Sequence, residues 1–175
     1  MKLTKVLGFA VLLASSQLVS AAAPAAPTVT GAPAASHVKP VQDMLAAMQA
    51  EKLMRNIAGT SRYASEDQRK GVFAKLDKVP PAQIHQSLAP PVARLVSAET
   101  ALEMTRFYSS SYGQRVLKQM YNSGPSYGNS DPVPTAAERK ELKRPEYLKA
   151  QKAFAEAETG IRHEAFVLLQ AISKR

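Results

Sequence analysis

Apolar residues recur at intervals of three and four along most of the chain, the spacing that places them on one face of an α-helix. The pattern predicts one helix over Val38–Ala58 and a long final helix over about 145–173. No stretch alternates apolar and polar residues as a strand does, so the sequence predicts an all-α fold. We expect a single compact antiparallel bundle of about five to seven helices. The predicted core seam of the final helix consists of Tyr147, Ala150, Phe154, Ala157, Ile161, Ala165, Leu168 and Ile172.

Local signals mark where several helices begin and end. Ser65–Gln68 and Thr135–Glu138 both have the spacing of a capping box, in which two side chains satisfy free backbone N–H groups. Ser97 is expected to cap a further helix. The pair Pro90-Pro91 should break or kink the helical pattern near it, because proline lacks the N–H that a helix interior needs. The Gly- and Pro-rich stretch Asn122–Pro134 is predicted to be a loop.

The stretch 97–121 is predicted to form a hairpin of two short helices, around which the other helices are organised. Its halves meet at Ser109-Ser110-Ser111, which ends the first helix and caps the second. Phe107 and Tyr108 fall at helical spacing with other apolar residues and are expected to point into the core. Gly113 has no side chain, so another helix could approach closely there.

The N-terminus has the three parts of a secretory signal peptide in their proper order. Lys2 and Lys5 precede an apolar run, Val6–Ala14, which is shorter than the ~20 residues of a membrane-spanning helix. Val19-Ser20-Ala21 then fits the small-x-small cleavage pattern. We therefore expect a signal peptide over 1–21, a disordered Ala/Pro-rich tether over 22–36 and a helical domain over 37–175. Export would make the protein periplasmic, with no transmembrane segment after cleavage.

Composition limits the partners that can be expected. Loss of Lys2 and Lys5 lowers the formal charge from +9 to +7, and basic residues interleave with acidic ones as on a solvated helix face. The chain has no Trp and no basic stripe with stacking aromatics, so nucleic-acid binding is not expected. Attraction to anionic membrane or cell-wall polymers remains an alternative function. The chain has no cysteine, so neither a disulfide nor a lipid anchor on cysteine is available.

One short motif matches a catalytic pattern. Gly124–Gly128 reads GPSYG, the G-x-S-x-G pattern of serine hydrolases, and Asp131 and His163 follow Ser126 in the appropriate order. A nucleophile elbow requires a strand before the serine and a helix directly after it. Here a predicted helix precedes the motif and a proline-rich loop follows it. A serine hydrolase is therefore kept only as an alternative to a non-enzymatic function.

Metal, cofactor and acid–base chemistry have weaker signals still. His37, His85 and His163 are far apart and lack a ligand-type residue at helical spacing, so neither a metal nor a cofactor is expected. His163 is expected on the outer face of the final helix, and His85 at a core margin. Glu99 and Glu103 share a helical turn near the Ser97 cap, where the helix dipole favours negative charge, so we expect no catalytic role for them.

The hairpin resembles the signature of an exported bacterial family, the domain of unknown function 2059 family. That signature is Phe-Tyr, a small residue, Ser-Pro, one residue and Gly-Gln-Lys. Phe107, Tyr108, Gly113 and Gln114 match it, whereas serine or tyrosine stands for the proline and Arg115 for the lysine. The resemblance extends over about 38–117. It implies an α-helical periplasmic domain of a Gram-negative bacterium, and it implies no catalytic residues.

These observations predict a non-enzymatic module that binds a protein, a peptide or an anionic polymer of the bacterial envelope. No catalytic, cofactor-binding or metal-binding residue is predicted, and the four signature residues are expected to be structural. The seam of the final helix is compatible with a monomer and with a homodimer. An apolar cleft beside the hairpin would be the most informative structural feature.

Overall fold

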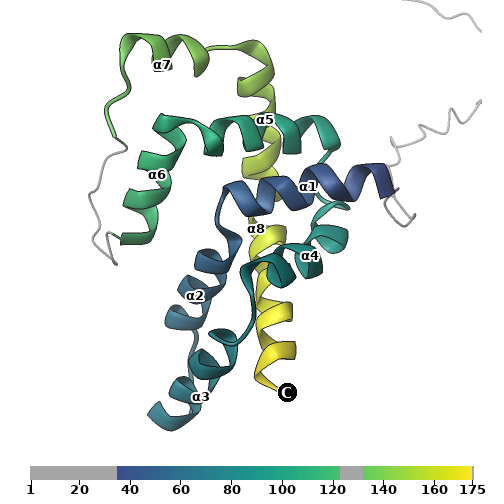
Figure 1. Ribbon diagram of the computed structural model, residues 1–175, viewed down its shortest axis with the longest axis vertical. Coiled ribbons are helices and arrows are strands. Elements are labelled where there is room, and N and C mark those ends of the chain that lie inside the picture. The colour runs from purple at the N-terminus through teal and green to yellow at the C-terminus, as the bar shows by residue number, and fades with distance from the viewer. Residues whose placement is uncertain (1–34, 123–131, 175) are drawn as a thin grey trace, which may run out of the picture. The chain divides into compact units, whose positions relative to one another are not determined.

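The computed structural model describes residues 35–122 and 132–174, which all belong to one compact unit, Gly31–Arg175 (Figure 1). Within these two ranges eight helices pack together and no strand occurs, which confirms the all-α prediction. The predicted signal peptide 1–21, nearly all of the predicted tether 22–36 and residues 123–131 of the predicted loop lie outside the described residues. The helices are α1 (Ala35–Ala47), α2 (Ala50–Thr60), α3 (Glu66–Leu76), α4 (Pro81–Val92), α5 (Ala98–Ser109), α6 (Ser111–Asn122), α7 (Ala136–Glu141) and α8 (Pro145–Ser173).

The stretch Val38–Ala58 forms two helices, so the prediction of one continuous helix is wrong. Gln49 stands between α1 and α2 in the left-handed region, at φ 57° and ψ 55°. That conformation costs a non-glycine residue about 1–2 kcal/mol, and contacts with α6 hold it. The Tyr121 hydroxyl donates to the Met48 carbonyl at 3.0 Å, and Gln49 Nε2 donates to Gln114 Oε1 at 3.2 Å. Partners distant in sequence therefore stabilise a break that local periodicity does not reveal.

The helix α4 continues through Pro90 and Pro91 to Val92, so of the break or kink predicted near these prolines, the break does not occur. The two prolines lack the N–H groups that would bond the carbonyls of Gln86 and Ser87. Both of those residues are exposed, so water can satisfy their free carbonyls. The buried face of α4 remains intact, and its packing keeps the prolines in the helix.

The longest helix, α8, contacts α2, α3, α4 and α5. Figure 1 shows α1 and α5 side by side and lying across the direction of α8, a crossing that periodicity alone does not predict. The bounds of α8 agree with the predicted helix over about 145–173. None of the helices in the described ranges has the length and the apolar character needed to cross a membrane.

The inward face of α8 follows most of the predicted seam. Phe154, Ala157 and Leu168 are only partly buried but pack on the core, and Leu169 is buried without having been predicted. Each large apolar side chain that is fully buried stabilises the fold by about 1.5–3 kcal/mol. The predicted seam residues that are buried are Tyr147, Ala150, Ile161, Ala165 and Ile172.

Candidate functional site

The candidate site is built on the corner where α5 meets α6, within the predicted hairpin. Ser110 separates the two helices, and its backbone N–H and its hydroxyl donate to the Phe107 carbonyl at 3.0 and 2.6 Å. The Ser110 hydroxyl accepts from the Gly113 N–H at 3.0 Å. A Cβ atom on Gly113 would lie 2.0 Å from the Phe107 carbonyl oxygen and 2.9 Å from the Tyr108 Cα. Gly113 thus permits a close approach, and its neighbour is the last turn of α5.

Gln114 completes this corner. Its Nε2 donates to the Tyr108 carbonyl at 2.5 Å, and its Oε1 accepts from Gln49. The four residues of the predicted signature therefore meet at one place. The carbonyls of Phe107 and Tyr108 accept hydrogen bonds, Gly113 has no side chain to clash with them, and the Gln114 side chain bonds the Tyr108 carbonyl. Their spacing in the sequence has a steric and hydrogen-bonding reason.

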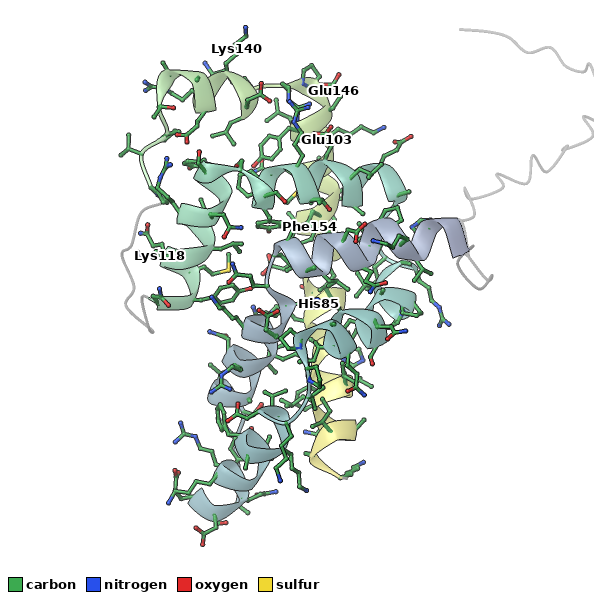
Figure 2. The ribbon with its side chains drawn as sticks, in the orientation of Figure 1. His85, Glu103, Lys118, Lys140, Glu146 and Phe154 are labelled. Atoms are coloured by element: carbon green, nitrogen blue, oxygen red, sulfur yellow. The ribbon has the colours of Figure 1, made fainter. Side chains whose placement is uncertain are left out.

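Five aromatic rings form a connected group beside the corner, which we call the aromatic cluster: Phe107, Tyr108, Tyr112, Tyr147 and Phe154. The Phe107 ring centroid lies 5.0 Å from that of Tyr108, 6.1 Å from that of Tyr112 and 5.2 Å from that of Tyr147. Tyr108 lies 6.1 Å from Phe154, which Figure 2 labels on α8. These spacings and tilted orientations are favourable for aromatic pairs.

The two signature aromatics differ in environment. Tyr108 is buried, as predicted, and burial raises the pKa of its hydroxyl well above its usual range. Phe107 is only half-buried but packs on the core, so the prediction that both rings point inward holds for Phe107 only in part. The exposed part of Phe107 faces a hollow on the surface.

Two hollows lie against the aromatic cluster. The corner cleft, of about 460 Å³, lies between the α5–α6 corner, α7 and the beginning of α8. The α6–α8 hollow, of about 490 Å³, extends past Met120, which is 53% exposed. The residues that line both hollows are Phe107, Tyr112, Leu142 and Tyr147. These four side chains therefore form a shared apolar wall.

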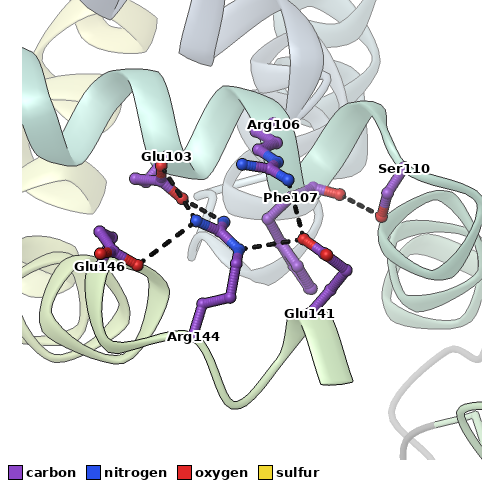
Figure 3. Close-up of polar contacts among 7 residues, drawn as sticks. All are labelled: Glu103, Arg106, Phe107, Ser110, Glu141, Arg144 and Glu146. Carbon is purple, nitrogen blue, oxygen red and sulfur yellow. Dashed lines mark hydrogen bonds and ion pairs between the residues drawn. The ribbon is translucent and has the colours of Figure 1, made fainter. Parts of the chain in front are cut away.

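Ion pairs, rather than apolar burial, attach α7 beside the corner cleft, since α7 has no buried residue. Glu141 accepts from Arg106 at 2.9 Å and from Arg144 at 3.0 Å, as Figure 3 shows. Arg144 also donates to Glu103 of α5 at 2.5 Å and lies 3.7 Å from Glu146. The hydrogen bond with Glu103 raises the pKa of Arg144, so this guanidinium remains charged among three carboxylates.

Glu138 makes a second attachment, from α7 to α6. It accepts from both Arg115 Nη atoms at 2.8 and 3.1 Å, and from the Ser111 hydroxyl at 3.0 Å. It also closes the predicted capping box with Thr135. The hydrogen bonds from Arg115 and from the Thr135 N–H lower the pKa of Glu138 to about 2.

The charges at the rim of the corner cleft are therefore mostly satisfied by one another. Among the described residues that line the cleft, Lys140 is the cation without an ion pair, and Figure 2 shows it directed away from α5. What the cleft offers to a ligand is mainly its apolar wall.

The residues of the alternative hydrolase assignment are only partly described. Ser126 and Asp131 lie outside the described residues, and His163 is exposed on α8, as expected. The element before the motif is α6, a helix that ends at Asn122. A nucleophile elbow requires a strand at that place.

The other titratable candidates have separate partners. His37 Nε2 lies 2.7 Å from the Val96 carbonyl, and the buried His85 lies 2.9 Å from Glu51. Within residues 35–122 and 132–174, no group of three potential metal ligands occurs. Glu99 lies 3.8 Å from Lys149, whereas Glu103 binds Arg144, so the two carboxylates serve different ion pairs.

Sequence reasoning missed several residues of the site. The sequence singles out Tyr112 only at the place of the signature proline, and it predicts no role at the site for Leu142 or Arg144. The seam pattern predicts a core position for Tyr147, which also lines both hollows. The spacing of Glu141 and Arg144, three residues apart, was a usable signal for a local ion pair, but not for its partners on α5.

No family model and no curated protein matches this sequence, and no solved structure matches its fold. The likeness to the domain of unknown function 2059 family therefore rests on the corner residues and stays a prediction.

Proposed function

We propose that this protein is a non-enzymatic helical module of the bacterial envelope that binds a peptide segment through apolar side chains. The observation that carries this proposal is the aromatic cluster with two hollows against it. One wall, formed by four apolar side chains, is common to both hollows. An extended segment could place one apolar side chain in each hollow while its backbone crosses the wall between them.

The chemistry of the corner cleft favours an apolar anchor over a charged one. Glu138, Glu141, Arg106 and Arg144 already have partners of opposite charge. A charged ligand would have to displace these pairs and would lose its own hydration. An apolar side chain instead removes apolar surface from water, at about 25 cal/mol for each Å² buried. The flexible, exposed Met120 in the α6–α8 hollow can adapt to different side chains.

The rival function, a serine hydrolase that uses Ser126 and His163, has less support. The helix α6 leads into its motif, and an elbow on a strand is what exposes the nucleophile in that class. The carboxylates near the hairpin are neutralised in ion pairs, so their presence is explained without a role in acid–base catalysis.

We further propose a periplasmic location after removal of residues 1–21, in a Gram-negative bacterium, with membership of the resembling family. The signal pattern and the matched corner residues support these proposals. We also propose that the helices act as one bundle organised on the α8 seam, which the shared core of α1, α2, α4, α5 and α8 supports.

Peptide selection tests the proposed binding. A phage-displayed library of random peptides is panned on the full mature chain, and a selected peptide is titrated by calorimetry. We expect selected sequences to share aromatic or aliphatic residues. Ala137 lines the corner cleft, so Ala137→Phe should fill it and weaken binding at least about tenfold, which corresponds to about 1.4 kcal/mol.

Ala136 is the matched control, because it is an exposed alanine of the same helix that does not line the cleft. Ala136→Phe should leave the affinity within about twofold. Equal losses in both variants, or a library that yields no peptide with apolar anchors, would contradict the proposed site. Hydrolysis of a generic ester that disappears in Ser126→Ala would favour the rival function.

A further inference from the structure

A separate hollow of about 400 Å³ lies where α2, α3 and the end of α6 meet, away from the corner cleft. We call it the basic–aromatic site. It has no lining residue in common with the corner cleft or the α6–α8 hollow, and none of its lining residues is acidic. Its lining residues are Lys52, Arg55, Asn56, Phe73, Tyr121 and Asn122.

Aromatic rings hold the cations of this site in place. The Lys52 ammonium lies 5.9 Å from the centre of the Tyr121 ring. Arg55 and the neighbouring Arg69 each have the guanidinium carbon 5.7 Å from the centre of the Phe73 ring. Cation–π contacts of this kind restrict long side chains that would otherwise be mobile. The positive charge is therefore partly ordered before any ligand arrives.

The carboxylates near this site leave one cation unmatched. Asp77 pairs with Arg55, and Glu66 lies 3.4 Å from Arg69. Glu51, next to Lys52 in the sequence, bonds instead to His85, which Figure 2 labels. Lys52 has no carboxylate partner in residues 35–122 and 132–174. An anion that enters the hollow would meet an ammonium that no carboxylate of the described residues neutralises.

The neutral polar groups of the hollow suit hydroxyl groups. The side-chain amides of Asn56 and Asn122 make no hydrogen bond with the described part of the chain, and each can both donate and accept. The Tyr121 hydroxyl donates to the Met48 carbonyl, so it is fixed in position. A sugar presents hydroxyls that donate and accept in the same way as these amides.

We propose that the basic–aromatic site binds an anionic sugar, meaning a sugar ring that carries a carboxylate or a phosphate. Lys52 and the free N–H groups of Arg55 bind the oxyanion, and Asn56 and Asn122 bind ring hydroxyls. Hydrogen bonds to an ionised group are roughly twice as strong as neutral ones, so the charged part dominates the affinity. This site goes beyond the proposed peptide binding, and its failure would leave the corner cleft untouched.

Three soluble probes test the site with the full mature chain. Tri-galacturonic acid supplies carboxylates, its methyl ester has the same rings without charge, and glucose 6-phosphate supplies a phosphate. We expect calorimetric binding of tri-galacturonic acid or glucose 6-phosphate with Kd below about 1 mM. Whichever of the two binds more tightly identifies carboxylated polymers or phosphorylated headgroups as the source. The methyl ester should bind at least about tenfold more weakly than the acid, because it lacks the charge.

Lys52→Met removes the ammonium but keeps an apolar stem over Tyr121. Lys118→Met is the matched control, because Lys118 is exposed on α6 and does not line the hollow (Figure 2). Lys52→Met should weaken binding at least about fivefold, and Lys118→Met less than about twofold. Circular dichroism confirms that both variants are folded. Equal effects of the two substitutions, equal binding of the acid and its ester, or no binding of either anionic sugar would overturn the proposal.

Discussion

Replacing Gly113 with alanine should destabilise the protein through a clash with backbone atoms. The added Cβ would lie 2.0 Å from the Phe107 carbonyl oxygen, which is far shorter than any contact between a carbon and an oxygen atom that are not bonded. The atoms concerned belong to the last turn of α5, so no flexible side chain can move aside. Either that turn or the beginning of α6 must shift by more than about 1 Å, because ordinary contacts lie beyond 3.4 Å.

The size of the effect follows from three contributions. Overpacking a close contact costs about 1–3 kcal/mol. A shift of the Phe107 carbonyl also weakens its hydrogen bonds from the Ser110 N–H and hydroxyl, each worth about 1 kcal/mol. Alanine regains about 1 kcal/mol through its better helix propensity. The net loss should be about 2–3 kcal/mol, or roughly 5–10 °C in the melting temperature of a chain of this size.

Thermal unfolding followed by circular dichroism measures this loss, and Gly71→Ala is the matched control. Gly71 lies inside α3, and a Cβ there would meet no atom within 4 Å. Helix propensity alone then applies, so Gly71→Ala should raise stability by up to about 1 kcal/mol. A Gly113→Ala variant that melts within about 1 °C of the wild type would refute the steric reasoning. So would an equal destabilisation by both substitutions.

Two further predictions concern pH. Hydrogen bonds from Arg115 lower the pKa of Glu138 from its ordinary value of 4.5 to about 2, so its contribution to stability is present above pH 4.5 and is lost as the pH falls towards 2. Between pH 4.5 and pH 2 the melting temperature should therefore fall less in Glu138→Gln than in the wild type. Parallel falls in the two proteins would contradict the role given to Glu138. Burial raises the pKa of Tyr121 from 10.0 to about 12, so its contribution is complete below pH 10 and is lost as the pH rises towards 12. Tyr121→Phe should lower the free energy of unfolding at pH 7 by about 1 kcal/mol, because it removes the hydrogen bond to the Met48 carbonyl. Between pH 9 and pH 11.5 the variant should lose less of its free energy of unfolding than the wild type. An equal alkaline loss in both proteins would show that Tyr121 is not responsible.

Local patterns in the sequence were sufficient for most of the helices and several of their caps. Ser97 accepts from the Thr100 N–H at 3.1 Å, and Ser65 accepts from the Gln68 N–H at 3.1 Å, because these bonds join residues three positions apart. At Ser65 the reciprocal part differs, since the Gln68 side chain bonds the Ala64 N–H instead of that of Ser65. Hydrogen bonds between residues so close in sequence can be predicted from a short window of the chain.

Features that depend on distant partners could not be predicted in the same way. The break at Gln49 requires Gln114 and Tyr121, which lie on α6. The position of α7 requires Arg106 and Arg115, although α7 itself shows only a capping box. Residue spacing gives the inward face of a helix but not the angle at which helices cross, so the two hollows beside the aromatic cluster were beyond sequence reasoning.

The central claim is that a peptide places apolar side chains against the aromatic cluster. Nuclear Overhauser effects between a selected peptide and the isotope-labelled mature chain test this claim most directly. We expect intermolecular contacts from apolar peptide side chains to the rings of Tyr112 and Tyr147 and to the Met120 methyl group. Contacts confined to α3, or a bound peptide that shows none to these three residues, would contradict it.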